Sequence, residues 1–222
     1  DWGQKLGDLM EERFGIPYAR TGQPYGLKAT EEWLMGIAGP LGLEKQAREM
    51  IRQEKGELSG EIDILKRFFD GKTALVEITE FPGPIRALSL ARMAEEFGAH
   101  PIIINIHPYT IKERMPSIKF LLKQGQNPDV ILTKGLFSLG TFYSSWQTEA
   151  ELEMIAGQYN NAVYLGSPLR HPGTPQVNLT TITGYPHYGY RGLKNISRLV
   201  QSSLEHASRP RSKLFRRVLY GG

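Results

Sequence analysis

Four short apolar runs in this 222-residue chain are each followed by an acid, an imidazole or a cation. Such runs are typical of buried parallel strands, whose carboxyl ends share one edge of a sheet and border the ligand sites of these folds. The polar residues after these runs and in the loop after the fourth are Glu80, His107, Lys134, Arg170, His171 and His187. Gathered on one edge, they would suit an anionic ligand or proton transfer. Taken alone, each of these residues is more typical of a surface or helix-capping group.

The apolar runs predict four strands of one sheet. The strands expected are Lys72–Ile78, His100–His107, Asp129–Lys134 and Asn161–Gly166. Residues 85–97 predict a helix between the first two, with Pro84 at its start and Gly98 just past its end. A strand–helix–strand unit implies parallel pairing. The alternation therefore predicts an α/β fold with a doubly wound parallel sheet of about four strands over residues 71–208.

Residues 1–70 predict helices and irregular chain without a strand. Residues 3–14 predict an amphipathic helix. Thr30 has the features of an N-cap for a second helix, which we expect to break at Gly39-Pro40. Apolar spacing from Leu43 onward predicts either one kinked helix or two helices.

The last part of the chain predicts a long connection, a helix and a basic tail. Residues 167–190 are rich in proline and glycine, and a long irregular connection of this kind is often functional. A helix follows with Leu193, Ile196 and Val200 on one face. Residues 209–222 hold five of the basic residues and no acid, and the formal charge of +4 becomes −1 without them. We interpret them as a solvated tail and expect no nucleic-acid partner.

Several kinds of chemistry are excluded or unsupported by the sequence. The chain has no cysteine, so its own residues form no disulfide, thiolate nucleophile or thiolate-held iron–sulfur cluster. The histidines are too dispersed for a metal motif. Gly71-Lys72-Thr73 precedes a predicted strand instead of following one, so it is not a phosphate-binding loop. Without a long apolar run or a secretory signal, we expect a cytoplasmic protein that does not enter a membrane.

Two stretches resemble a known protein family. The run from Phe14-Gly-Ile-Pro-Tyr18 through Gln23-Pro-Tyr-Gly-Leu-Lys-Ala-Thr-Glu-Glu-Trp-Leu34 is similar to the family pattern "fGiPy" followed by "p-G-ikaTdewL". Residues 183–193, with the run Gly189-Tyr-Arg-Gly192, are similar to its late "G-P-x-x-GY-x-G" segment. The family is the nitrogenase component 1 type of oxidoreductase. It contains nitrogenase catalytic subunits, their cofactor-assembly scaffolds and the light-independent protochlorophyllide and chlorophyllide reductases.

The resemblance covers most of the chain but only the later half of a family subunit. It implies that residues 1–70 end a preceding domain, that 71–208 form a Rossmann-like C-terminal domain and that 209–222 are a tail. The loop that carries over as the wall of a cofactor or substrate pocket is Gly184, Tyr185, Pro186, His187, Gly189, Tyr190 and Gly192. Its glycines let the backbone approach a bulky ligand. Where nitrogenase catalytic subunits have their cofactor-coordinating histidine, this chain has Leu179.

The expected function is therefore one part of a metallocofactor or tetrapyrrole substrate pocket. The candidate contacts are that loop together with Glu80, His107 and Lys134. The resemblance implies an iron–sulfur cluster or metallocofactor in the full-length protein, with none bound by this chain alone. It also implies two partners, a homologous component 1 subunit and an ATP-dependent iron–sulfur reductase. The alternative is a non-catalytic metallocofactor scaffold or a metal- or chelate-binding module, so whether the protein is an enzyme and what its substrate is stay open.

Overall fold

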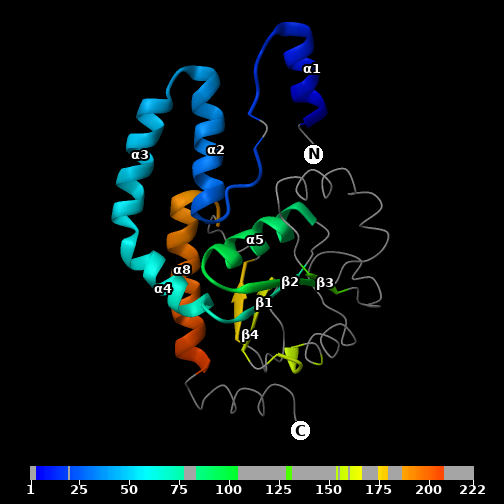
Figure 1. Ribbon diagram of the computed structural model, residues 1–222, viewed down its shortest axis with the longest axis vertical. Helices are drawn as coiled ribbons and strands as arrows, with labels where there is room; N and C mark the ends of the chain where they lie inside the picture. The colour runs from blue at the N-terminus through cyan, green and yellow to red at the C-terminus, as the bar shows by residue number, and fades with distance from the viewer. Residues whose placement is uncertain are drawn as a thin grey trace.

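A computed structural model describes residues 4–19, 21–77, 84–104, 129–131, 154, 156–159, 161–166, 175–179 and 187–207 (Figure 1). The helices are α1 (Gln4–Phe14), α2 (Gly26–Leu41), α3 (Glu44–Glu57), α4 (Ser59–Phe69), α5 (Pro84–Glu96) and α8 (Gly189–Ala207). The strands are β1 (Thr73–Glu77), β2 (His100–Ile104), β3 (Asp129–Ile131), β4 (Ala162–Gly166) and β5 (Gln176–Asn178).

The strands form one parallel sheet in the order β3-β2-β1-β4-β5. This confirms the predicted α/β fold and the four predicted strands as parallel neighbours. The fifth strand, β5, lies within residues 167–190, which the sequence predicts to be irregular. That prediction was wrong because three residues with a single apolar side chain carry no detectable period.

Apolar residues along β1 point alternately to the two faces of the sheet, as pleating requires. Ala74 and Val76 belong to the larger core, which α4, α5 and α8 complete. Leu75 belongs to a smaller core on the other face, together with Ile102 and Tyr164. Because both faces of β1 are covered, the strand is apolar throughout its centre instead of alternating with polar residues.

The strand order reverses between β1 and β4. From β1 the chain passes through α5 to β2 on one side, whereas β4 and β5 are added on the other side. At such a reversal the connections leave in opposite directions and open a crevice at the carboxyl edge of the sheet. The first turn of α5, which follows β1, lies at this edge.

The predicted start and end of the second helix were wrong. Thr30 is not the N-cap: α2 begins at Gly26, and the Thr30 hydroxyl donates to the Gly26 carbonyl oxygen at 2.5 Å. Instead the Glu96 carboxylate accepts from the N–H groups of Leu27 and Lys28, each at 2.8 Å. A carboxylate from another helix thus satisfies the free donors of the first turn, which local sequence cannot reveal.

The helix also continues through Gly39-Pro40 to Leu41, where Gly42 ends it in the left-handed conformation with φ 65°. Pro40 is tolerated because it lies in the final turn of α2, where few backbone hydrogen bonds of the helix remain to be broken. From Leu43 onward, the sequence predicts either one kinked helix or two helices, and the structure decides between them. Leu58 separates α3 from α4, so residues 44–69 form two helices.

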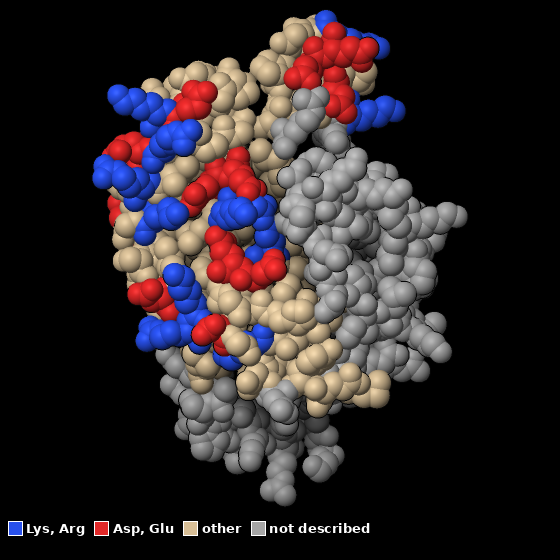
Figure 2. Space-filling model, viewed as in Figure 1, with Lys and Arg blue, Asp and Glu red and all other residues tan. Residues whose placement is uncertain are grey.

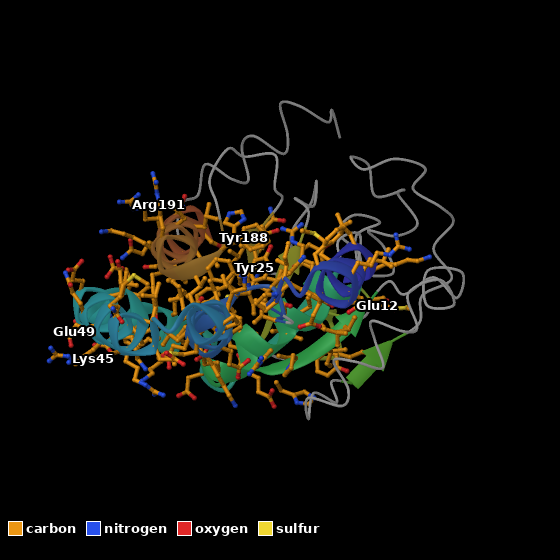
Figure 3. All side chains as sticks on the ribbon, turned by 90° about the horizontal axis from the view of Figure 1, so that it is seen from above. Glu12, Tyr25, Lys45, Glu49, Tyr188 and Arg191 are labelled. Carbon is orange, nitrogen blue, oxygen red and sulfur yellow. The ribbon has the colours of Figure 1, made fainter. Side chains whose placement is uncertain are left out.

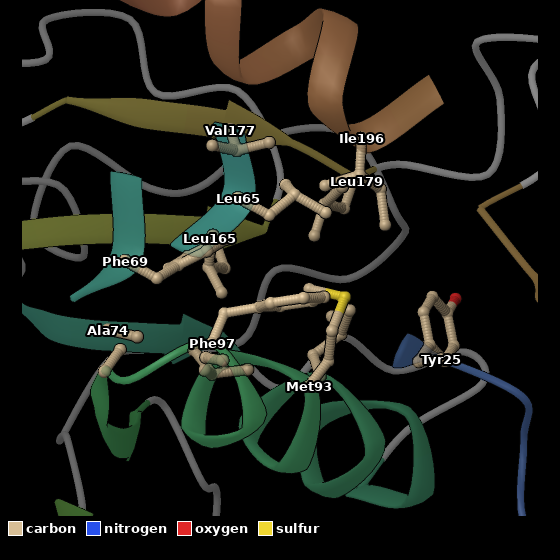
Figure 4. Close-up of a cluster of buried hydrophobic side chains, with 14 of the residues drawn as sticks. Tyr25, Leu65, Phe69, Ala74, Met93, Phe97, Leu165, Val177, Leu179 and Ile196 are labelled. Carbon is tan, nitrogen blue, oxygen red and sulfur yellow. The ribbon is translucent and has the colours of Figure 1, made fainter. Parts of the chain in front are cut away.

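The helices before residue 70 share a core with the sheet. Leu65 and Phe69 of α4 are fully buried and lie among Phe97, Leu165 and Val177 (Figure 4). The stacked rings of Phe69 and Phe97 have centroids 6.3 Å apart. Residues 26–69 and the sheet therefore bury apolar surface jointly, while a domain boundary near residue 70 stays a prediction.

The charged residues on the face shown in Figure 2 are of both signs and interspersed. Arg92 of α5 pairs with Glu32 of α2 through two hydrogen bonds, and Lys55 of α3 lies 2.7 Å from Glu31. Each of these partly exposed pairs contributes little to stability, but together they link α2 to α3 and α5. No helix in the described part of the chain is long and apolar enough to cross a bilayer.

Candidate functional site

The loop before α8 is wound tightly onto the start of the helix. Gly189 has φ 66°, and its N–H donates to the Pro24 carbonyl oxygen at 2.8 Å. The Gly192 N–H donates to the Tyr188 carbonyl oxygen at 3.0 Å. A Cβ atom at Gly192 would overlap the backbone of His187. These glycines therefore permit a turn that buries the His187 side chain, which is only 2% exposed.

A buried arginine lies close to that histidine. Arg86, the third residue of α5, is 5% exposed, and its Nε donates to the Tyr25 hydroxyl oxygen at 3.1 Å. Its Nη2 atom and Nε2 of His187 are both buried, and neither has a hydrogen-bond partner within the described part of the chain. The Tyr25 and Tyr188 rings lie against one another, with centroids 4.8 Å apart (Figure 3). We call Tyr25, Arg86, His187 and Tyr188 the arginine cluster.

Burial sets the protonation of this cluster. Burial, and then the nearby Arg86 charge, lower the pKa of His187 from 6.5 to about 4, so the imidazole is neutral at neutral pH. Burial raises the pKa of Tyr25 far above its usual value, against the opposing influence of Arg86, so this phenol keeps its proton. At neutral pH the cluster thus holds one full charge, the guanidinium of Arg86.

The Tyr190 side chain belongs to the main core, and its buried hydroxyl has no partner among the described residues. Burial, followed by the charges of Glu31, Glu54 and Glu96, raises the pKa of Tyr190 to about 12. These acids belong to α2, α3 and α5. A cofactor contact for Tyr190 stays a prediction.

Most of the other predicted site residues lie outside the part of the chain that the structure describes. Outside the described residues lie Glu80, His107, Lys134, Arg170, His171, Gly184, Tyr185 and Pro186. Of the predicted set, the structure describes His187, Gly189, Tyr190 and Gly192, and it brings His187 near the first turn of α5.

Sequence reasoning missed Tyr25 and Arg86. A signal for Arg86 was present, because it lies four residues before Leu90 and seven before Met93, on the apolar face of the helix. An arginine on such a face requires a partner. Tyr25 carried no comparable signal, since only the tertiary fold brings it to Arg86.

The described residues favour contact with an anionic or polar group over metal coordination. Among them no three His, Cys, Asp or Glu side chains gather to hold a metal ion. The unpaired donors of Arg86 and the free ring nitrogen of His187 are instead suited to hydrogen bonding. Both lie where an α/β sheet ordinarily binds its ligands.

A parallel sheet of this kind, with helices on it and a strand order that reverses between β1 and β4, defines a Rossmann-like domain. The profile of the family described as Nitrogenase component 1 type Oxidoreductase matches residues 1–205. The chain belongs to this family, as the sequence predicts.

Individual relatives are more distant. The chain is 29% identical over 102 residues to a nitrogenase iron-molybdenum cofactor biosynthesis protein NifE of Clostridium pasteurianum, covering 45% of this chain and 22% of that protein. It is 23% identical over 202 residues to a nitrogenase molybdenum-iron protein alpha chain of Methanothermobacter thermautotrophicus, covering 90% and 39%.

Solved structures support the fold. Nitrogenase Cp1 at pH 6.5 superposes with a TM-score of 0.59 at 15% identity, covering 92% of this chain and 48% of that one. Nitrogenase Cp1 at pH 5 gives the same TM-score at 17% identity, covering 93% and 46%. The chain thus spans less than half the length of each of these proteins.

Proposed function

We propose that this chain forms one wall of a metallocofactor or tetrapyrrole pocket in a nitrogenase component 1-type protein. The observation that carries the proposal is the buried His187 imidazole, whose Nε2 finds no partner among the described residues although a buried polar atom is ordinarily paired. A bound ligand would supply that partner. Gly189 supports the proposal, because nothing lies within 4 Å of its Cβ position and its backbone is open to a bulky group at the helix start.

The residues fit such a group as a wall that makes hydrogen bonds. The chain has no cysteine, and the described residues contain no metal-ligand cluster, so coordination would come from elsewhere in the assembly. A metallocofactor would supply the redox chemistry when bound. His187 would contact it as a neutral imidazole, and the predicted Glu80, His107, Lys134, Gly184 and Tyr185 would complete the wall.

Two roles remain for the whole protein. In the first, it is an oxidoreductase of the cytoplasm that works with a homologous subunit and an ATP-dependent iron–sulfur reductase, as the family resemblance implies. In the second, it is a scaffold on which a metallocofactor is assembled without turnover. The relative described as a cofactor biosynthesis protein favours the second role. The relative described as a molybdenum-iron protein chain favours the first.

The test is the composition of the protein as its gene encodes it, purified without oxygen. We expect iron with acid-labile sulfide, or a tetrapyrrole absorption band. His187→Ala should lower the bound content several-fold, because it removes a contact. His100→Ala, at an exposed position on β2, should leave it unchanged. Equal content in the wild-type protein and a folded His187→Ala variant would contradict the proposal.

The two roles are separated by adding an ATP-dependent iron–sulfur reductase. Sustained ATP-dependent reduction of an added substrate indicates the enzyme. Release of the bound group to an apo-protein acceptor without such reduction indicates the scaffold.

A further inference from the structure

We infer that Arg86 binds a carboxylate group through its free Nη2 donor and that Tyr25 holds the guanidinium in position for this contact. The inference rests on the proposed pocket and names the chemistry of its occupant. Only 5% of the Arg86 surface is exposed, and Nη2 has no partner among the residues that the structure describes. A buried charge without a counter-charge is costly unless something pairs with it.

No described residue provides that counter-charge. Arg52 pairs with Glu49, Lys55 with Glu31 and Arg92 with Glu32, and no such pair is found for Arg86 among the described residues. The two titratable groups that interact with Arg86 in this part of the chain, the Tyr25 phenol and the His187 imidazole, are uncharged at neutral pH. Within the described residues, the positive charge therefore has no counter-charge, and a bound anion would neutralise it.

An anionic oxygen suits the free donor. The planar, forked guanidinium of arginine makes strong charge-assisted hydrogen bonds to carboxylates. Because Nε is engaged by Tyr25 at 3.1 Å, the plane of the guanidinium is held and Nη2 is the donor atom left for such a bond. Arg86 also lies in the first turn of the 13-residue α5, where the helix dipole adds positive potential.

Tyr25 is itself held on several sides, which suits a positioning residue. It immediately precedes α2, whose first N–H groups are fixed by Glu96 of α5. The preceding residue, Pro24, accepts a hydrogen bond from Gly189. The Tyr25 ring packs against Tyr188, so the phenol is only 1% exposed. The hydroxyl that orients Arg86 is therefore tied to α2, α5 and the start of α8.

The carboxylate could belong to a small organic acid or to a side chain of a macrocycle. Two probes distinguish these sources in the protein as its gene encodes it. Malonate represents the free acid, and its binding is measured by titration calorimetry. Protoporphyrin IX represents the macrocycle, with its uncharged dimethyl ester as the matched probe, and binding is followed by visible absorption.

We expect at least one carboxylate probe to bind the wild-type protein and to bind Arg86→Met about tenfold or more weakly. Arg86→Lys should bind with intermediate affinity, because it keeps the charge but loses the fork. Tyr25→Phe should bind the probe several-fold more weakly than the wild type. The affinity for the uncharged ester should be the same in Arg86→Met and in the wild type. Arg52→Met, on the exposed side of α3, is the control and should match the wild type. Circular dichroism shows whether each variant is folded. If Arg86→Met does not fold, the affinities of Arg86→Lys and Tyr25→Phe test the inference in its place.

The outcomes separate this inference from the proposed function. If the protein retains a metallocofactor or tetrapyrrole through His187 but no carboxylate probe depends on Arg86, the inference fails and the pocket stands. If malonate binds through Arg86 but the protein holds neither class of cofactor, the pocket fails and the carboxylate site stands. Absence of binding by every carboxylate probe overturns the inference.

Discussion

At the scale of single residues, the arginine cluster combines a buried cation with neutral groups that leave its charge uncompensated. Burying Arg86 beside His187 has a cost that the described residues do not offset with an acid. Sites that bind ligands commonly carry such a cost in the free protein. The same burial lowers the pKa of His187, so the stability of the folded chain depends on pH.

The pH dependence of stability follows from His187. Burial lowers the pKa of His187 in the folded chain from the ordinary 6.5 to about 4. Between pH 4 and 6.5 the imidazole is therefore protonated in the unfolded chain and neutral in the folded chain. In this respect the free energy of unfolding should be constant well above pH 6.5 and about 2 kcal/mol lower at pH 5. Urea unfolding at pH 7.5, 6 and 5 measures it. His187→Gln should flatten this dependence whereas His100→Gln should not, and equal slopes in all three proteins would rule out the assignment.

Gly192 should tolerate no side chain. In Gly192→Ala the Cβ atom would overlap the His187 backbone, so we expect a loss of roughly 2–4 kcal/mol in unfolding free energy. Gly56 lies in α3 with nothing near its Cβ position, and Gly56→Ala should gain about 0.5–1 kcal/mol. Urea unfolding of both variants checks the pair. A Gly192→Ala protein as stable as wild type would show that the turn at His187 is looser than described.

At the scale of elements, α2 depends on a cap from a distant part of the chain. Glu96 accepts from two N–H groups of the first turn, and Glu96→Ala should cost about 1–2 kcal/mol because both donors lose their partner. Burial raises the pKa of Glu96, so its charge is partly disfavoured, and Glu96→Gln should cost less than Glu96→Ala. The neighbouring Glu95→Ala, at an exposed position, should change stability by less than about 0.5 kcal/mol. Chemical denaturation compares them, and equal losses for both alanine variants would remove Glu96 from this role.

The sequence predicted elements where a local signal was strong. The β-branched runs and the Pro84 and Gly98 boundaries identified β1, α5 and β2 because each signal lies within the element. The start of α2 and the existence of β5 escaped prediction. The start of α2 depends on Glu96, which lies about seventy residues further along the chain than Leu27. The strand β5 depends on its pairing with Tyr164 and Gly166 of β4.

The same distinction applies to the site. His187 was predicted from a motif, and the structure places it near the start of α5, but Tyr25 and Arg86 meet only through the tertiary fold. Their sequence separation of 61 residues explains why no pattern pointed to the pair. Pattern reasoning therefore identifies the edge of the sheet where we propose the site and misses the contact between Tyr25 and Arg86.

At the scale of the whole molecule, the helices before residue 70 and the sheet share apolar surface. We expect residues 26–77 and 161–166 to unfold together, because Phe69 lies within the same core as Phe97 and Leu165. Native-state hydrogen exchange should give the same opening free energy for buried amides of α4 and β4. Phe69→Ala should lower both by about 3–5 kcal/mol. Separate opening energies, with only α4 responding, would instead support a domain boundary near residue 70.

The central claim is that the carboxyl edge of this sheet binds a ligand beside His187 and Arg86. An experimental structure of the protein as its gene encodes it, purified without oxygen with its native ligand, tests this most directly. We predict density for a metallocofactor or tetrapyrrole within hydrogen-bond distance of His187 Nε2, with an anionic oxygen at Arg86 Nη2. A bound group at the opposite edge of the sheet, with both atoms still unpaired, would contradict the account.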